Sequence, residues 1–255
     1  MNTLEEKALT ILLTMDIASQ NLAARSFALS LASQLNAELI GLIFEDENLL
    51  QSTQYPFASE IVSDSALERK VDYSNMERSL RAWSAQTQTQ LLTQAQRANI
   101  KCTFRTYRGK GTGTFLEQSE PASLLIFSGL RISRFQTRPK SNTAYILVDN
   151  DTKLENSLVI LNQLKNEGVN DVVFINTGTQ SVKANIEAAI QALLQSGTQT
   201  DLKTIENNLP QQLASVLRNQ PASVVIVPAG HQIFHDTKSF RELQNYLSCP
   251  VLVVK

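Results

Sequence analysis

Residues 8–15 read ALTILLTM, a nearly continuous apolar run that ends just before Asp16. Such a run is typical of a strand covered by helices on both faces, so it predicts a central strand of a parallel sheet. After Asp16 the apolar residues follow a spacing near 3.6, which predicts an amphipathic helix. Residues 39–44 then predict a second strand. This part of the chain therefore predicts a β-α-β unit.

The alternation of strands and helices continues to the end of the chain. A helix is predicted over residues 75–98, and strands over 100–107 and 124–127. The second half predicts strands 143–148, 171–176, 200–205, 223–227 and 251–254, and helices 154–165, 182–195, 210–218 and 239–247. Short connections between such elements require right-handed crossovers and a parallel sheet. The predicted fold class is α/β, with two tandem open parallel-sheet, Rossmann-like domains and helices on both faces.

Two similar segments indicate an internal duplication. Residues 120–126 read EPASLLI and residues 220–226 read QPASVVI, an offset of 100. Two buried strands can also resemble each other by chance, so both explanations stay open. The first strands of the halves end 133 residues apart, at Asp16 and Asp149, so the first half holds about 33 additional residues. Residues 45–74 have no counterpart and form a predicted insertion.

The repeat also predicts the domain boundaries. We expect one domain over residues 1–141, which includes the insertion 45–74, and a second over residues 142–255. Only about a dozen residues separate Gly129 from Thr143, too few for a helix, a fifth strand and a linker. The first domain is therefore expected to be incomplete.

Composition limits the function classes. Of the 255 residues, 42% are apolar and 18% charged, which indicates a globular chain. A net charge of −1 provides no overall field that would attract nucleic acid or an anionic membrane. Two cysteines without a CxxC pair favour a reducing compartment. The start of the chain lacks a signal-peptide pattern, and no apolar run approaches the roughly 20 residues of a membrane span. We expect a cytoplasmic protein with no nucleic-acid or membrane partner.

The order of elements, the Asp at the end of the first strand and the terminal Cys249-Pro-Val-Leu-Val-Val254 resemble the universal stress protein family. The resemblance covers nearly the whole chain as a tandem pair. It implies five parallel strands with helices on both faces in each unit and a role in the stress response. It also implies that ATP is a candidate ligand, because some members bind it and others bind no nucleotide.

The ATP-binding members of that family carry the pattern G-x-x-G-x9-G-[ST] after the fourth strand, where backbone N–H groups cradle phosphates. Gly129 and Gly230 match the first glycine in the two halves. The later glycines are replaced by the residues Ile132, Asn142, Ile233 and Leu243. A side chain there blocks close approach of backbone to phosphate, so ATP binding in the second half is expected to be weak or absent.

The predicted ligand-binding residues are Asp16, Gly129, Arg131, Arg134, Asp149 and Gly230. In the family the two aspartates line the nucleotide pocket, and an Asp after a strand can equally cap the next helix. Arg131 and Arg134, with Arg138 and Lys140, form a basic segment that can hold an anion such as a nucleotide phosphate. Arg108 and Lys110 are expected to reach the same sheet edge. A solvated basic loop is the alternative.

The remaining candidate motifs point to less specific chemistry. Gly109–Gly113 (GKGTG) follows a strand, as a phosphate loop would, but its spacing fits no known pattern and also suits a flexible turn. His231 and His235 have the spacing of metal ligands on a helix, yet they are expected in a loop, and no metal is predicted. Cys102 and Cys249 are expected to be small core residues. No Ser-His-Asp order, no paired carboxylates in a glycine-rich context and no nucleophile elbow suggest a catalytic residue.

Three functions remain open. The leading hypothesis is a binding or regulatory protein that senses a nucleotide or another small anionic ligand. The alternatives are a nucleotide-binding enzyme of the adenine-nucleotide hydrolase-like superfamily and a ligand-free structural protein that forms a homodimer. The insertion 45–74 is expected to cover a ligand site or an interface, with Tyr55, Pro56 and Phe57 as anchors, unless it is disordered.

Overall fold

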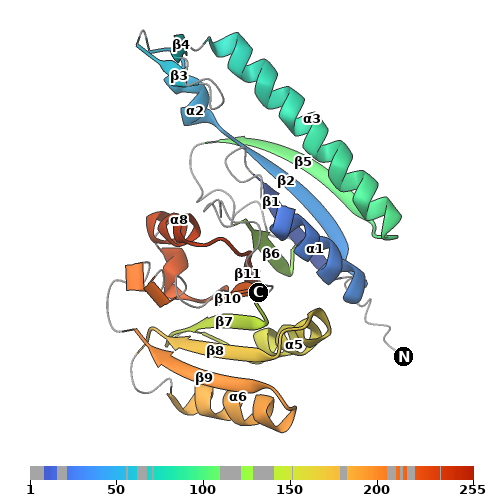
Figure 1. Ribbon diagram of the computed structural model, residues 1–255, viewed down its shortest axis with the longest axis vertical. Helices are drawn as coiled ribbons and strands as arrows, with labels where there is room; N and C mark the ends of the chain where they lie inside the picture. The colour runs from blue at the N-terminus through green and yellow to red at the C-terminus, as the bar shows by residue number, and fades with distance from the viewer. Residues whose placement is uncertain are drawn as a thin grey trace, which may run out of the picture.

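The computed structural model describes a set of segments along the 255-residue chain. They are residues 9–15, 22–55, 57–61, 68–70, 72–109, 122–128, 141–150, 152–178, 183–205, 211–212, 215–216, 222–235 and 237–255. These segments form a nine-stranded sheet, a separate two-stranded sheet and helices that cover both faces of the larger sheet (Figure 1). None of the helices within them is long and apolar enough to cross a membrane.

The nine-stranded sheet contains strands from both halves of the chain. From one edge to the other it consists of β5 (Cys102–Gly109), β2 (Glu38–Asp46), β1 (Thr10–Met15), β6 (Leu124–Phe127), β11 (Val251–Val254), β10 (Val224–Pro228), β7 (Thr143–Val148), β8 (Asp171–Asn176) and β9 (Gln199–Thr204). Neighbouring strands are parallel, except that β6 and β11 are antiparallel. The α/β parallel-sheet fold predicted from the sequence is confirmed.

The two halves have the same strand order. In the first half β1 lies between β2 and β6, and in the second half β7 lies between β8 and β10. The fourth strand of each half also begins with the same hydrogen bond. The Ser123 N–H donates to the Thr10 carbonyl at 2.9 Å, and the Ser223 N–H donates to the Thr143 carbonyl at 2.9 Å. Both serines belong to the Pro-Ala-Ser segments that match at an offset of 100.

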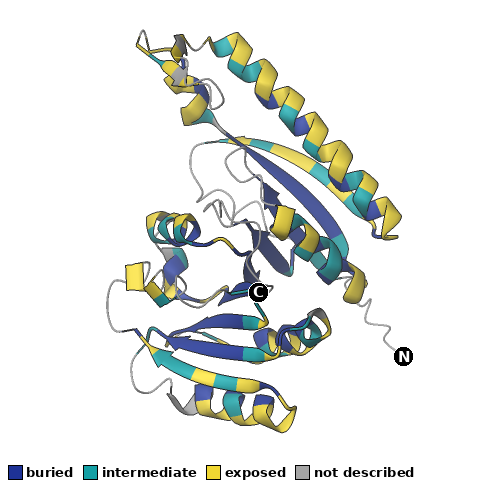
Figure 2. Cartoon of the chain, in the orientation of Figure 1, coloured by how far each residue is buried: buried dark blue, intermediate teal, exposed yellow. Residues whose placement is uncertain are grey.

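Helices cover the two faces of the sheet because the buried strands are apolar on both sides. Ile11 and Leu13 of β1 belong to one core cluster, and Leu12 between them belongs to the other. The first cluster includes residues of α1 (Leu22–Gln34), α3 (Tyr73–Arg97), α5 (Glu155–Leu164) and α6 (Lys183–Gln195). The second includes residues of α8 (Thr237–Tyr246). Figure 2 shows the central strands almost uniformly buried between these layers.

The predicted elements agree closely with the observed ones. Each predicted strand or helix that falls within the described residues is present, and its ends differ from the prediction by at most two residues. The helix predicted over residues 210–218 lies mostly outside them. Short 3₁₀ turns at Lys165–Glu167 and Gln232–His235 were not predicted.

The strands β6 and β11 join the halves into one continuous sheet. Val251 to Val254 of β11 pair with Phe127 to Leu124 of β6, and β1 occupies the other side of β6. The second half thus fills the place beside β6 where a fifth strand of the first half would pair. Residues 129–140 are not described, so the absence of a strand there stays a prediction, as does the division into domains at residue 141.

The insertion contains elements that the sequence did not predict. β2 continues to Asp46, and α2 (Glu47–Ser52), β3 (Ser59–Ile61) and β4 (Glu68–Lys70) follow before α3. β3 and β4 form the separate antiparallel pair. In Figure 1 these elements lie at the end of the molecule farthest from β9 and α6. In the second half only residues 177–182 connect β8 to α6.

Two of the predicted anchors of the insertion are exposed, and their expected role at a ligand site or an interface stays untested. Tyr55 and Phe57 are 59% and 82% exposed, so neither ring attaches the segment to the protein's own interior. Leu50 of α2 is 2% exposed, and α2 contacts α3. Pro56 lies outside the described residues.

Candidate functional site

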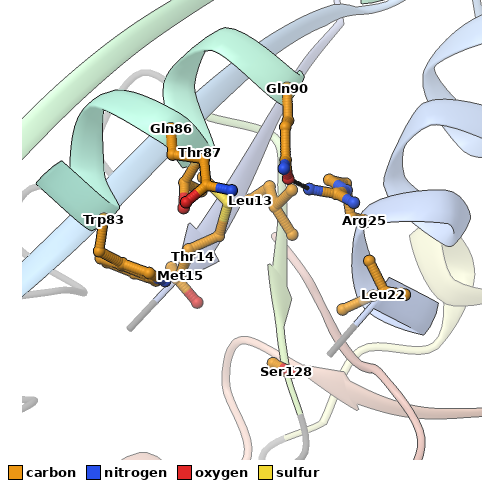
Figure 3. Close-up of a pocket in the computed structure, with 11 residues that line it drawn as sticks. Leu13, Thr14, Met15, Leu22, Arg25, Trp83, Gln86, Thr87, Gln90 and Ser128 are labelled. Carbon is orange, nitrogen blue, oxygen red and sulfur yellow. Dashed lines mark hydrogen bonds between the residues drawn. The ribbon is translucent and has the colours of Figure 1, made fainter. Parts of the chain in front are cut away.

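A pocket of about 250 Å³ opens at the carboxyl ends of β1 and β6, between α1 and α3 (Figure 3). β1 is the strand at which the order of the first half reverses, with β2 on one side and β6 on the other. Open α/β sheets bind ligands at such a switch point, outside the carboxyl ends of the strands. The location alone makes this pocket the candidate ligand site of the first half. No described residue of the insertion lines it.

The pocket has a buried floor and a wall that can form hydrogen bonds. Thr14 and Ser128, at the ends of β1 and β6, are each 5% exposed. α3 contributes Trp83, Thr87 and Gln90, whose spacing of four and three residues places them on one face of the helix. This wall combines an aromatic surface with hydroxyl and amide groups. Such a lining suits a small organic molecule that carries a ring and polar edges.

Close packing of α3 on the sheet shapes the pocket. Leu91 of α3 is fully buried against β2, opposite Gly41. A Cβ atom at residue 41 would lie 2.5 Å from Leu91 Cδ2 and 3.3 Å from the Cε atom of Met15, which lines the pocket. Any side chain at this position would therefore force the side chains of Leu91, Phe104 or Met15 to move.

Arg25 of α1 gives the pocket a positive charge. Its Nη1 atom donates to Gln90 Oε1 at 2.8 Å, so the two side chains meet across the gap between α1 and α3 (Figure 3). Gln90 is neutral, so this bond leaves the positive charge of Arg25 in place. Among the described lining residues Arg25 is the one charged side chain. The electrostatics of the pocket therefore favour an anionic ligand.

Four predicted ligand-binding residues lie outside the described residues: Asp16, Gly129, Arg131 and Arg134. Their neighbours in the sequence are nevertheless at the pocket. Met15 directly precedes Asp16, Ser128 directly precedes Gly129, and both Met15 and Ser128 line the pocket. The prediction that these four residues contact a ligand stays untested.

The sequence patterns did not single out Arg25, Trp83 or Gln90 as site residues. The sequence did contain a pattern that could have predicted the α3 side of the pocket. Trp83, Thr87 and Gln90 form a stripe at positions i, i+4 and i+7, and two of the three are polar on the face that should pack inward. No comparable sequence pattern pointed to Arg25 as a residue of the pocket.

The equivalent position of the second half is built differently. Asp149 directly follows β7 and is 3% exposed. Its Oδ1 accepts a hydrogen bond from the Thr152 hydroxyl at 2.6 Å, and its Oδ2 accepts one from the Gln232 N–H at 2.6 Å. The carboxylate thus ties the loop after β7 to the turn after β10. Two roles were expected for Asp149. Contact with a ligand stays a prediction. Helix capping is not observed, because α5 begins after Leu154 without a side-chain cap.

His231 completes this buried cluster. The ring is fully buried, and its Nδ1 accepts a hydrogen bond from the Ile233 N–H at 3.0 Å. The Nε2 atom lies 3.0 Å from Thr177 Oγ1, and that hydroxyl lies 3.2 Å from the Val148 carbonyl. Because Nδ1 accepts an N–H, we assign the neutral tautomer with the proton on Nε2.

The residues that replace the glycine pattern are core residues in the second half. Ile233 is 3% exposed and Leu243 is fully buried, and both pack in the cluster beneath α8. Gly230 is exposed in the turn after β10. The predicted ligand contact at Gly230 stays untested. Asp149, His231 and Ile233 are thus buried side chains in the loops at the second switch point.

The metal alternative for the two histidines stays untested, because the side chain of His235 lies outside what the structure describes. Among the described residues, no group of three His, Cys, Asp or Glu side chains could hold a metal ion. Both ring nitrogens of His231 lie within hydrogen-bond distance of protein groups.

Arg108, which is expected to contribute to an anion site, is paired with two carboxylates, and its contact with an anion stays a prediction. Arg108 lies near the end of β5, and its Nε and Nη2 atoms contact Glu45 Oε2 at 3.0 and 2.9 Å. Its Nη2 also lies 3.5 Å from Glu77 Oε1. The hydrogen bond with Glu45 raises the pKa of Arg108 further, so its charge is fixed and already compensated. Lys110, predicted to act with it, is not described.

The two cysteines lie away from the pocket. Cys249 is 7% exposed in the core, as predicted, and burial raises its pKa to about 12. Cys102 of β5 is only partly buried. Burial and the nearby Glu38 carboxylate raise its pKa to about 11. Neither thiol has the lowered pKa of a reactive nucleophile.

Comparisons with known proteins give evidence at the level of the fold. No protein-family model matches the chain, and no curated protein is significantly similar to it in sequence. A universal stress protein from Archaeoglobus fulgidus DSM 4304 superposes with a TM-score of 0.56 at 10% identity, covering 96% of this chain and 96% of that protein.

Two further solved structures are similar over most of their length but superpose less well. A functionally unknown protein from Pseudomonas aeruginosa PAO1 has a TM-score of 0.47 at 12% identity, covering 98% of this chain and 93% of that one. The cytoplasmic domain of a prokaryotic cation chloride cotransporter has a TM-score of 0.47 at 11% identity, covering 96% of this chain and 95% of that one. On the evidence of its strand order and of the Archaeoglobus structure, this chain has a universal stress protein fold.

Proposed function

We propose that this protein is a cytoplasmic, tandem, universal stress protein-like regulator that binds a small anionic ligand in the pocket of its first half. The observation that carries the proposal is the pocket at the β1/β6 switch point. Among its described lining residues, Arg25 is the charged side chain and Trp83 is the aromatic one. A nucleotide, which combines a flat ring with phosphate groups, is the first ligand to test.

The sequence next to the pocket supports an anionic ligand. Ser128 lines the pocket, and the basic segment with Arg131 and Arg134 follows it within six residues. Asp16 follows Met15 in the same way and can accept hydrogen bonds from the ligand. The glycine pattern is degenerate in this half, so the proposal assigns the anion to arginine side chains in place of backbone N–H groups.

In this proposal the second half has a structural role. Asp149 and His231 hold the loops at the second switch point together, and Ile233 occupies the space there. A ligand would have to break these buried hydrogen bonds to enter. We therefore expect one ligand per chain.

The experiment uses the single tryptophan of the chain as a local reporter. Trp83 lines the pocket, so ligand binding should change its fluorescence. ATP, ADP, AMP and inorganic phosphate are titrated separately into the full-length protein, and calorimetry gives the stoichiometry. Loss of a charge-assisted hydrogen bond costs about 1.5–3 kcal/mol, so Arg25→Gln should raise the Kd roughly 10- to 150-fold.

The matched control is Arg97→Gln, which removes an exposed arginine at the end of α3. It should leave the Kd unchanged. If neither the fluorescence nor the heat signal responds to any of these anions, the proposed site is wrong. Steady ATP turnover that Arg25→Gln abolishes would instead favour the hydrolase-like alternative.

A further inference from the structure

Arg25 and Gln90 join the two helices that flank the pocket. The Arg25 Nη1 atom donates to Gln90 Oε1 at 2.8 Å, although the two residues are 65 positions apart in the sequence. Each is the neighbour of a residue that is packed in the core. Ala24, next to Arg25, is 2% exposed, and Leu91, next to Gln90, is fully buried. Close packing therefore sets the backbone positions, and the hydrogen bond holds the guanidinium at the gap between α1 and α3 (Figure 3).

The partner of Arg25 is a neutral amide. A guanidinium only donates hydrogen bonds, so the atom that faces it is the amide oxygen of Gln90, and the amide NH2 group remains a donor. This bond uses one N–H group of Arg25 and leaves the other guanidinium donors for a ligand. The pair thus offers several donors and one positive charge, which is the pattern of an anion site.

No described carboxylate compensates the charge of Arg25. Within the described part of the chain, no ion pair includes it. α1 contains no Asp or Glu, and neither does α3 from residue 78 to its end. Arg108 provides the contrast, because Glu45 and Glu77 both contact it. The protein therefore pairs one arginine with carboxylates and the other, at the pocket, with an amide.

A glutamate at position 90 would bind Arg25 more strongly than the glutamine does. Its carboxylate has nearly the shape of the amide, can accept the same hydrogen bond and adds attraction between opposite charges. It would also neutralise the one charged side chain among the described lining residues. The amide gives a weaker contact in the ligand-free protein but keeps the positive charge for a ligand.

The cationic end of the pocket lies apart from an aromatic end. Gln90 and Trp83 are seven residues apart, so they share one face of α3 and lie roughly 10 Å from each other along its axis. Figure 3 shows the Trp83 ring on one side of Thr87 and the Arg25–Gln90 pair on the other. A ligand that reaches both ends must carry its ring and its anionic group on a spacer, as a nucleoside monophosphate does. Inorganic phosphate can occupy only the cationic end.

We propose that Gln90 sets the charge selectivity of the pocket. It is a positioning residue, which holds Arg25 by a neutral hydrogen bond so that Arg25 can bind the anionic group of a ligand whose ring contacts Trp83. This inference rests on the proposed function, because it concerns the same pocket. It adds that the identity of residue 90 decides whether the described lining is cationic or neutral.

The test compares the Gln90→Glu variant with the wild type, both as full-length protein. AMP, ATP and adenosine are titrated separately, and Trp83 fluorescence reports binding. Gln90→Glu should raise the Kd of both nucleotides roughly 10- to 150-fold, as loss of the Arg25 charge does. Adenosine lacks the anionic group, so its Kd should be the same for both proteins. Salt screens the attraction of Arg25, so binding of AMP should weaken with salt more in the wild type than in Gln90→Glu.

The matched control is Gln88→Glu, which adds the same charge to α3. Residue 88 is exposed and does not line the pocket, and residues two positions apart on a helix face different sides. This control should keep the wild-type Kd. Gln90→Met removes the acceptor without adding a charge, so it should bind both nucleotides more tightly than Gln90→Glu does. The melting temperature of Gln90→Glu should not fall, because the glutamate keeps the hydrogen bond with Arg25.

The outcomes separate this inference from the proposed function. If the wild type binds AMP or ATP and Gln90→Glu binds it equally well, Gln90 does not set the selectivity, while the pocket can still be the ligand site. An equal loss of affinity in Gln88→Glu and Gln90→Glu would reveal a long-range effect of charge and would also overturn the inference. If the wild type binds neither nucleotide, the proposed function fails and this inference fails with it.

Discussion

At the switch point of the first half, between β1 and β6, the structure leaves a pocket of about 250 Å³ between two helices. At the same point of the second half, between β7 and β10, the side chains of Asp149, His231 and Ile233 are buried in the loops that follow the strands. Strand order does not distinguish the two places. The difference lies in a few side chains that follow the strands.

The comparison shows that equivalent positions of the two halves carry different side chains. In the second half a carboxylate accepts hydrogen bonds from the chain's own Thr152 hydroxyl and Gln232 N–H. In the first half the pocket instead keeps a cationic and an aromatic side chain, Arg25 and Trp83, at an opening. Three predictions test this contrast.

The largest effect is expected at the strand that joins the halves. Leu252 of β11 is fully buried and pairs with β10 on one side and β6 on the other. Leu252→Ala should lower the free energy of unfolding by about 2–5 kcal/mol, because it leaves a cavity in a close-packed core. The measurement is denaturant unfolding followed by circular dichroism and by Trp83 fluorescence, which reports on the first half.

Because β11 belongs to the cores of both halves, both probes should shift together in one transition. Val159→Ala is the control, since that side chain is 59% exposed, and it should change stability by no more than about 0.5 kcal/mol. Two separate transitions, with the Trp83 signal unmoved by Leu252→Ala, would show that the halves are independent domains.

A smaller effect is expected from opening the closed switch point. Asp149→Ala removes the acceptor of the Gln232 N–H and the Thr152 hydroxyl. A buried donor without a partner costs about 1–3 kcal/mol, so the variant should be destabilised by at least that amount. Asp149→Asn keeps one carbonyl oxygen as an acceptor and should therefore lose less stability than Asp149→Ala.

The control for this prediction is Asp201→Ala, because Asp201 lies exposed on the edge strand β9. The Asp201→Ala variant should have nearly the same free energy of unfolding as the wild-type protein. Equal stabilities of the Asp149→Ala and Asp201→Ala variants, measured by urea unfolding, would contradict the structural role given to Asp149.

The pattern of apolar residues was sufficient to predict the strands and helices. Runs such as residues 143–148 and 251–254 are apolar without interruption, and this directly reflects burial on both faces. An uninterrupted apolar run does not indicate which strands are neighbours, because a uniformly apolar strand can pair with any other. The antiparallel contact between β6 and β11 was therefore not predictable from the pattern.

The sites were harder to predict than the fold. Asp149 was recognised at the end of its strand, but its partner, the Gln232 N–H, is 83 residues away in the sequence and belongs to the backbone. Arg108 looked like a free cation because Glu45, which compensates it, lies 63 residues earlier on the neighbouring strand. Pairings of this kind depend on strand register, which local sequence does not encode.

The smallest effect concerns the reactivity of the two thiols, one in each half. Burial raises the pKa of Cys102 to about 11 and that of Cys249 to about 12. Only the thiolate reacts, and below the pKa its fraction rises about tenfold per pH unit. Cys102, on the partly exposed edge strand, should react slowly with a chromogenic disulfide at pH 8 and about tenfold faster at pH 9. Cys249 should react only in molecules that unfold.

The same shifts fix the sign of the pH dependence of stability. The folded protein holds the proton of Cys249 more tightly than the unfolded chain, whose thiol has its ordinary pKa of 9.0. This contribution to stability is therefore complete below about pH 9 and is lost as the pH rises towards about 12. Leu252→Ala should accelerate modification of Cys249 through more frequent unfolding, and modification of Cys102 should change much less. Equal rates for the two cysteines in the native protein would show that the second half is as open as the first.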